Sequence, residues 1–203
     1  MASDINVIKG YLIGAGVDLD KCFVAGGYVR DVDRGVAPKD MDLFFERSED
    51  IEKFANFLDK IIPKSSVPTF GVITSERYST EFAYTYSNLP AIDLPVQLIR
   101  RTGTPDEILS TFDFTINQCY KRFDQNLPTR KGSGRLLKVI DKSQTKHTLL
   151  SRMFKFINDG YDIELEELKK VMKLTIEGIE ENFPDRVYLK AKHISKSKSG
   201  EAF

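Results

Sequence analysis

The stretch that decides the fold reads Phe23-Val-Ala-Gly-Gly-Tyr-Val-Arg-Asp31 and is followed by Lys39-Asp-Met-Asp-Leu43. Its apolar beginning predicts a buried strand, and the residues after Tyr28 predict a short helix. Gly26 and Gly27 between them predict a tight turn whose backbone N–H groups approach an anion, at a helix N-terminus that favours negative charge. The order strand, glycine turn, helix therefore suits phosphate binding, whereas a Gly-Gly pair alone marks only a turn.

Asp40 and Asp42 fall in a second predicted strand at residues 40–44. Residues two apart in a strand point to the same face, so the two carboxylates are expected side by side. Repulsion and burial would raise the pKa of one of them unless a cation shares both. Mg²⁺ prefers a few carboxylates together with phosphate oxygens and water. The combination predicts a metal–nucleotide site, although an isolated Asp-x-Asp would also fit a strand end, and Arg30 with Asp31 would also fit a surface ion pair.

Secondary-structure signals along the rest of the chain predict an α+β protein. Ser48 is expected to cap a helix, and Thr104-Pro-Asp-Glu107 reads as a capping box with proline at the first helical position. Predicted helices lie at residues 5–13, 28–34, 48–62, 147–159 and 164–182. Predicted strands lie at 22–25, 41–45 (40–44 if it includes both aspartates), 69–75, 80–86, 95–100 and 136–140. Because mixed elements come first and helices last, we expect a mixed sheet flanked by helices with a short helical C-terminal extension.

The composition of the 203 residues sets the broad class. Hydrophobic residues make up 41%, enough for a folded core, and 30 basic residues balance 30 acidic ones. Two cysteines, Cys22 and Cys119, are too few for a disulfide scaffold or a four-ligand zinc site and are expected to be buried and inert. Without a signal peptide or a membrane-spanning run, the protein is expected to be soluble and cytoplasmic. The oligomeric state is open.

Four ordered motifs resemble a known superfamily. Gly26-Gly-Tyr-Val-Arg-Asp31 and Lys39-Asp-Met-Asp-Leu43 are similar to the signature of the polymerase-β-type nucleotidyltransferases, and in particular to the head domain of class II CCA-adding enzymes and bacterial poly(A) polymerases. Phe112-Asp-Phe-Thr-Ile-Asn117 resembles the Arg-Arg-Asp-Phe-Thr-Ile-Asn motif of that family, and Leu150–Gly160 resembles the helix that begins its neck.

The resemblance implies a function and a set of site residues. The chain would transfer NMP from an NTP substrate to an acceptor hydroxyl, with an RNA 3′ end as the leading acceptor, using Mg²⁺ or Mn²⁺. Asp40 and Asp42 would be the catalytic and metal-binding residues. The nucleotide-binding set would be Gly26, Gly27, Arg30, Asp31, Lys39, Asp113, Asn117 and Arg152. Small phage-encoded members exist in the family, which would place the protein in a host cytoplasm.

The resemblance also implies a domain order. Residues 1–145 would form the nucleotidyltransferase head, 146–185 a neck-like helical extension, and 186–203 a basic flexible tail. The segment 121–155 carries ten basic residues against two acidic ones, and we expect it to meet the acceptor backbone. The acceptor-binding residues proposed within it are Lys131, Arg135 and Lys138.

Four departures from the family pattern keep alternatives open. Thr111-Phe112 replaces the arginine pair, for which Arg100, Arg101 and Lys121 are substitutes, and Gln97 stands where many members place a third carboxylate. No template that selects C and A is found, and too few residues follow 163 for a full neck, body and tail. The acceptor could therefore be a protein or a small molecule, as in toxin-type members, or the chain could be an inactive nucleotide- or RNA-binding module.

Three tyrosines, Tyr78, Tyr84 and Tyr86, stand in strand-like sequence. Their position favours cross-strand packing over stacking on a nucleobase.

Overall fold

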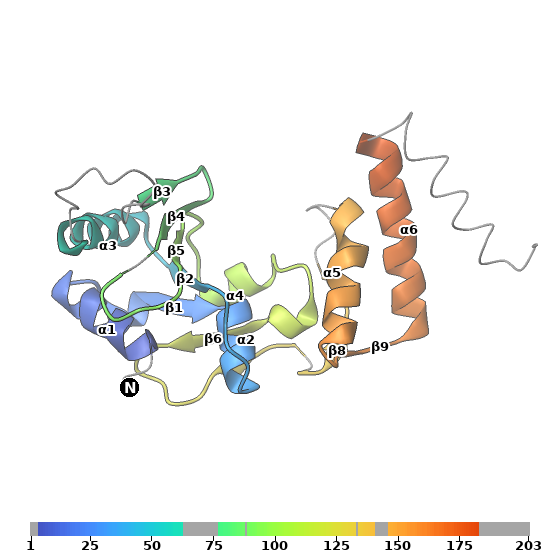
Figure 1. The fold of residues 1–203 in the computed structure, drawn as a ribbon, viewed down its shortest axis with the longest axis horizontal. Coiled ribbons are helices and arrows are strands. Elements are labelled where there is room, and N and C mark those ends of the chain that lie inside the picture. The colour runs from blue at the N-terminus through green and yellow to red at the C-terminus, as the bar shows by residue number, and fades with distance from the viewer. Residues whose placement is uncertain (1–3, 63–76, 88, 133, 141–145, 183–203) are drawn as a thin grey trace, which may run out of the picture. The chain divides into compact units, whose positions relative to one another are not determined.

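The computed structural model describes residues 4–62, 77–87, 89–132, 134–140 and 146–182. The chain divides into two compact units, whose elements are labelled in Figure 1. The first unit comprises Met1–Phe112 and Asn117–Gly132, and the second comprises Asp113–Ile116 and Ser133–Phe203.

A mixed sheet forms the centre of the first unit. Among the described residues its seven strands lie in the order β3-β4-β5-β2-β1-β6-β7. Their bounds are β1 Cys22–Ala25, β2 Met41–Phe45, β3 Arg77–Ser79, β4 Ala83–Tyr86, β5 Val96–Ile99, β6 Cys119–Arg122 and β7 Thr129–Arg130. β2 and β5 run parallel, and the other neighbouring pairs of these strands are antiparallel. The predicted α+β class with a mixed, mostly antiparallel sheet is confirmed.

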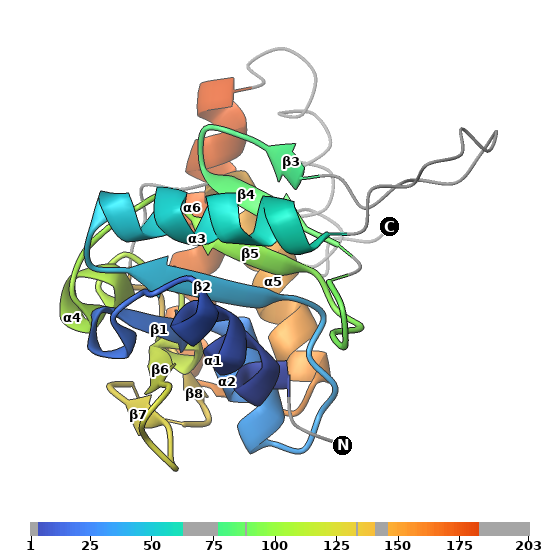
Figure 2. The ribbon, with the colours of Figure 1, turned by 90° about the vertical axis from the view of Figure 1, so that its left-hand side faces the viewer.

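Helices α1 (Asp4–Gly14) and α3 (Ser48–Ile61) cover one face of this sheet (Figure 2). Alternation along β2 gives each face its own character. The residues that join the core beneath α1 and α3 are Met41, Leu43 and Phe45. Phe44 lies on the opposite face, where it packs with residues of the short helix α4 (Pro105–Leu109). Asp42 shares the face of Phe44, so it lies away from α1 and α3.

The helix ends test two predictions. At α4 the capping box is present as expected: the Thr104 hydroxyl accepts from the Glu107 N–H, and the Glu107 carboxylate accepts from the Thr104 N–H at 2.8 Å. At α3 the prediction is wrong. Ser48 is the first helical residue, Arg47 is the N-cap, and no side chain caps the helix. The Arg47 guanidinium instead pairs with Asp50 at 2.7 Å, which anchors the first turn through charge.

One predicted strand is confirmed and another differs from the structure. β2 spans the apolar run Met41–Phe45 as predicted, so Asp40 lies directly before the strand and not within it. The predicted strand 80–86 is shorter in the structure: residues 80–82 form the turn of the β3–β4 hairpin, and only Ala83–Tyr86 is a strand. The Thr80 hydroxyl accepts from the Ala83 N–H at 3.0 Å within this turn. The short polar side chain thus offers the backbone a turn instead of an extended pairing. The predicted strand 69–75 lies outside the described residues.

The second unit is built around α5 (Lys146–Asn158) and α6 (Leu165–Asn182). β8 (Leu136–Leu137) pairs in parallel with β9 (Asp162–Ile163), and Phe114 forms a bridge with Val139. Buried side chains from all these parts form one core, including Phe114, Leu137, Met153, Phe156 and Val171. The predicted helices at 147–159 and 164–182 are confirmed. The division into head, neck and tail stays a prediction, and residues 183–203 lie outside the described part.

The structure also bears on two predictions made from the composition, the state of the cysteines and the presence of a membrane-spanning segment. Cys22 and Cys119 are buried free thiols, and burial raises their pKa to about 12 and about 11, so neither is a reactive thiolate. In the part of the chain that the structure describes, no helix has the length and apolar character to cross a membrane.

Candidate active site

A row of side chains crosses the sheet on the face that α1 and α3 leave uncovered. The register pairs Asp42 of β2 with Gln97 of β5, and Gln97 with Thr85 of β4. Residues paired across strands share a face. All three side chains are partly exposed, whereas their sequence neighbours Met41, Leu43, Val96 and Leu98 are buried on the other face. Asp42 therefore stands at an accessible polar position of an otherwise apolar strand.

Asp40 lies directly before β2 and is partly exposed. It is not a strand residue as predicted, so strand alternation does not orient its side chain. Its charge nevertheless reaches Asp42: burial first, and the Asp40 carboxylate second, raise the pKa of Asp42 to about 7. The expected repulsion between the two carboxylates is therefore present, and it raises the pKa of Asp42.

The donor set at this position suits a hard divalent cation. A carboxylate whose pKa is raised by burial and by a like charge gains from a nearby cation, which would stabilise the ionised form. Asp40 and Asp42 supply oxygen ligands of the kind that Mg²⁺ and Mn²⁺ take, and Gln97 adds an amide oxygen one strand away. Among the described residues, no cluster of three or more His, Cys, Asp or Glu side chains is arranged for a metal. Any ion here would have to complete its shell with water or substrate oxygens.

The glycine turn follows β1 as expected. Gly26 has φ +78° and ψ −132°, a region that residues with a side chain rarely adopt. Its N–H donates to the Cys119 carbonyl at 2.9 Å, which ties the turn to β6, and its carbonyl accepts from the Arg30 N–H at 3.1 Å. Helix α2 (Gly27–Asp33) begins immediately after this turn. The turn is therefore fixed by bonds on both sides.

The Arg30 guanidinium is held in place beside this turn. Its Nε donates to Asp31 Oδ1 at 2.7 Å, and its Nη1 donates to Asn117 Oδ1 at 2.6 Å. Asn117 is buried, at 7% exposed, and the Arg30 and Asp31 side chains are only 11% and 18% exposed. Nη2 lies 3.9 Å from the position that a Cβ on Gly27 would take. Four of the predicted nucleotide-binding residues, Gly27, Arg30, Asp31 and Asn117, are thus brought together.

The other predicted site residues are placed differently. Lys39 is exposed in the connection before β2. Asp113 and Arg152 belong to the second unit, where they form an ion pair with each other. Of the acceptor-binding residues, Lys131 belongs to the first unit and pairs with Asp106, whereas Arg135 and Lys138 are exposed residues of the second. Their roles stay predictions.

One substitute for the missing arginine pair faces elsewhere. The Arg100 guanidinium lies 5.0 Å from the ring centroid of Tyr84, and its Nη1 donates to the Thr80 carbonyl. Tyr84 belongs to the core beneath α1 and α3. Arg100 therefore stays with the hairpin on the face opposite Asp42.

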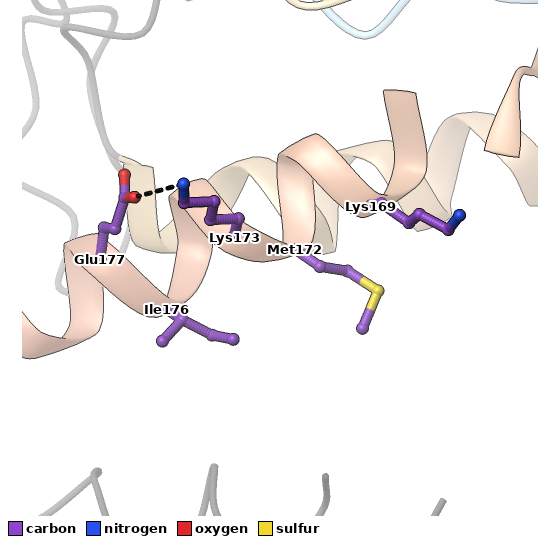
Figure 3. Close-up of a pocket in the computed structure, with 5 residues that line it drawn as sticks. All are labelled: Lys169, Met172, Lys173, Ile176 and Glu177. Carbon is purple, nitrogen blue, oxygen red and sulfur yellow. Dashed lines mark ion pairs between the residues drawn. The ribbon is translucent and has the colours of Figure 1, made fainter. Parts of the chain in front are cut away.

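Two features of the site could not be predicted from the sequence. The contact between Arg30 and Asn117 joins residues 87 positions apart, and the place of Thr85 in the row depends on strand register. Neither has a local signal, because both follow from tertiary pairing. A depression on α6 is no part of the site. It is lined by one helix alone (Figure 3), by Lys169, Met172, Lys173, Ile176 and Glu177, and it offers no paired carboxylates.

A comparison with protein families places the chain in one of them. A family model described as "Gabija anti-defense 2 family protein" matches residues 5–149. No curated protein matches the sequence.

Solved structures of CCA-adding enzymes match the fold. The Thermotoga maritima CCA-adding enzyme complexed with tRNA has a TM-score of 0.64 at 20% identity, over 88% of this chain and 44% of that one. A CCA-adding enzyme in complex with CTP has a TM-score of 0.59 at 17% identity, over 90% and 45%. An apo form of a CCA-adding enzyme has a TM-score of 0.61 at 15% identity, over 97% and 53%. The nucleotidyltransferase-type fold that the motifs implied is confirmed, and the chain spans about half the length of these structures.

Proposed function

The chain belongs to the Gabija anti-defense 2 family. From its nucleotidyltransferase-type fold and the site described above, we propose that it is a Mg²⁺-dependent nucleotidyltransferase that moves NMP from an NTP to an acceptor hydroxyl. The leading acceptor is an RNA 3′ end. The observation that carries this proposal is the position of Asp42. Its partly buried carboxylate shares an accessible sheet face with Gln97, and the charge of Asp40 raises its pKa. Among the described residues no basic side chain forms an ion pair with Asp42, so a cation brought with the substrate would stabilise its ionised form.

Asp40 and Asp42 would hold the metal. When bound, a divalent ion lowers the pKa of the attacking hydroxyl and stabilises charge on the departing pyrophosphate. The other residues position the substrate. Arg30, held by Asp31 and Asn117, would present its charge to the triphosphate next to the glycine turn. Because two acceptors hold this guanidinium in place, little side-chain entropy is lost when a phosphate binds.

The acceptor-binding part of the proposal concerns Lys131, Arg135 and Lys138. Replacing all three by alanine would weaken retention of RNA and make it less dependent on salt, since phosphate contacts release counterions. NTP binding would stay unchanged, which separates the role of these three residues from that of the catalytic ones.

The family description favours a second acceptor class. A family described as anti-defense would act on a component of the defence that it names, and a hydroxyl on a protein of that system is then the acceptor. The transfer chemistry and the roles of Asp40 and Asp42 are the same, and only the surface that meets the acceptor changes.

One experiment separates these readings. The purified chain is incubated with each α-labelled NTP and Mg²⁺, with total RNA in one arm and with protein from cells that carry the Gabija defence in the other. Label on RNA supports the first acceptor and label on protein the second. The double variant Asp40→Ala/Asp42→Ala should abolish transfer, whereas the exposed Asp124→Ala should keep it. Absence of label in every arm, or transfer that survives the double variant, would contradict the proposed function.

A further inference from the structure

The three tyrosines of the β3–β4 hairpin fall into two classes. Tyr84 and Tyr86 are 6% and 0% exposed, and their hydroxyls donate to Glu52 and Asp59 on α3. They pack across strands as the sequence predicted. Tyr78 of β3 is 68% exposed, so packing does not account for its ring.

Strand register places Tyr78 in the row that contains Thr85, Gln97 and Asp42. Tyr78 pairs with Thr85, Thr85 with Gln97, and Gln97 with Asp42. The strands β3, β4, β5 and β2 lie side by side in this order (Figure 2). With neighbouring strands about 4.8 Å apart, the backbone of Tyr78 lies roughly 14 Å from that of Asp42. The Asp42 and Tyr78 side chains cover part of this distance, and the sugar and base of a nucleotide whose α-phosphorus sits at Asp42 would cover the rest.

The face along this row is polar and accessible. The opposite end of the same face is apolar and covered, since Phe23, Phe44, Ile108 and Leu109 form a closed cluster there. Between Tyr78 and Asp42 stand Thr85 and Gln97, both partly exposed, and each has a donor and an acceptor. The row therefore runs from the carboxylate of Asp42, past two side chains that can form hydrogen bonds, to an exposed aromatic ring.

Resting on the proposed function, we propose that Tyr78 is a stacking platform for a nucleobase, with Gln97 and Thr85 binding the sugar or base edge between the platform and Asp42. An aromatic ring binds any base through its face, so this surface gives affinity without strict sequence selection. The base belongs either to the NTP or to the 3′-terminal nucleotide of the acceptor, and binding of each is measured separately.

The direct test uses fluorescence. The chain has no tryptophan, so the substitution Tyr78→Trp introduces a single reporter into the platform. Phe82→Trp is the matched control, because Phe82 is 72% exposed in the adjoining turn but outside the row.

The two variants should respond differently to nucleotides. Saturable quenching of the Tyr78→Trp variant by NTP with Mg²⁺ assigns the platform to the incoming nucleotide, and quenching by a short single-stranded RNA assigns it to the acceptor. The Phe82→Trp variant should respond to neither probe. Indole fluorescence of the Tyr78→Trp variant that neither probe changes would overturn the inference.

Kinetics separate this inference from the proposed function. Tyr78→Ala should raise the KM of the stacked substrate about 5- to 100-fold with kcat much less affected, and Tyr78→Phe should restore it. Phe82→Ala should match the wild type. If the wild type transfers NMP and Tyr78→Ala leaves both KM values within about twofold, the platform is refuted while the transferase stands. If the wild type transfers nothing, the proposed function fails, and quenching of the Tyr78→Trp variant still decides whether a base binds.

Discussion

At the residue scale, the protonation of Asp42 makes the stability of the first unit depend on pH. Its pKa is about 7 in the folded protein and close to 3.8 when unfolded, because burial and Asp40 disfavour the charged form. The unfolded chain therefore releases this proton first as the pH rises. Between pH 4 and pH 7 the native state holds more protons than the unfolded one, so stability falls with rising pH across this window and the loss is complete above it.

This sign gives a prediction for Asp42→Asn. In the presence of EDTA the variant should be more stable than the wild type at pH 8 by about 2–4 kcal/mol, because a pKa raised from 3.8 to about 7 corresponds to about 4 kcal/mol and the partial exposure of Asp42 reduces this. The advantage should shrink toward pH 4.5. Urea unfolding at both pH values measures the difference. Added Mg²⁺ should stabilise the wild type at pH 8 and leave Asp42→Asn unchanged. A variant advantage that is equal at the two pH values would show that Asp42 does not titrate in this range.

Asn117 gives a second prediction. Its buried amide oxygen accepts from Arg30 Nη1, so Asn117→Ala removes a charge-assisted hydrogen bond and leaves a cavity. We expect a loss of about 1–3 kcal/mol in unfolding free energy and a rise in the KM for NTP. Asn117→Asp keeps an acceptor for Arg30 and should recover much of the NTP affinity. Equal KM values for the wild type and Asn117→Ala would show that the position of Arg30 does not matter for the nucleotide.

How far the sequence predicts these residues depends on the range of the contact. Asp40, Asp42 and the glycine pair are close in sequence, so their spacing and charge are enough to predict a metal–nucleotide site. The link between Arg30 and Asn117 and the row through Gln97 and Thr85 depend on which strands become neighbours. No local pattern contains that information, because strand order is set by the packing of the whole sheet.

At the scale of elements, the turn between β1 and α2 requires a backbone conformation at Gly26 that other residues rarely adopt. Gly26→Ala forces a side chain into φ +78° and ψ −132°, while its Cβ would meet only the Phe112 ring at an ordinary 3.5 Å. We therefore expect a loss of about 1–3 kcal/mol from backbone strain rather than from a clash.

Gly27→Ala is the matched control. Gly27 opens α2 without a positive φ, and its added Cβ would meet nothing closer than Arg30 Nη2 at 3.9 Å. Alanine should be tolerated there within about 1 kcal/mol. Thermal or urea unfolding of the two variants measures the contrast. If Gly26→Ala and Gly27→Ala lower the unfolding free energy by the same amount, the positive φ of Gly26 is not the reason that the turn needs glycine there.

Element ends show where local signals suffice. The capping box at Thr104 is complete within four residues, and both of its bonds form as predicted. At α3 the same reasoning placed the cap at Ser48, but Arg47 and Asp50 form an ion pair across the first turn and the helix begins one residue earlier. In the β3–β4 hairpin the Thr80 hydroxyl decides where the strand breaks. A single side-chain hydrogen bond shifts a boundary by a few residues, which hydrophobic periodicity does not resolve.

At the scale of the whole molecule, the two units are interleaved along the chain. The segment Asp113–Ile116 belongs to the second unit although it lies between α4 and β6 of the first. Phe114 is fully buried there, with its ring centroid 5.5 Å from that of Phe156 in an edge-to-face contact. The predicted boundary at 145 follows the change from mixed elements to helices, and such a composition shift cannot reveal that four residues from the middle of the chain complete a helical core.

Phe114 therefore tests whether this inserted segment stabilises the second unit. Phe114→Ala should lower its unfolding free energy by about 3–5 kcal/mol, because it removes a fully buried aromatic ring and leaves a cavity. Phe154→Ala on α5 is the control, since Phe154 is 47% exposed and its loss should cost no more than about 1 kcal/mol. Hydrogen exchange of α5 and α6 amides reports on this unit specifically, and strands β1 and β2 report on the first. If Phe114→Ala leaves the exchange of α5 and α6 unchanged, the inserted segment is not part of their core; if it speeds exchange there while β1 and β2 stay protected, the two units unfold independently.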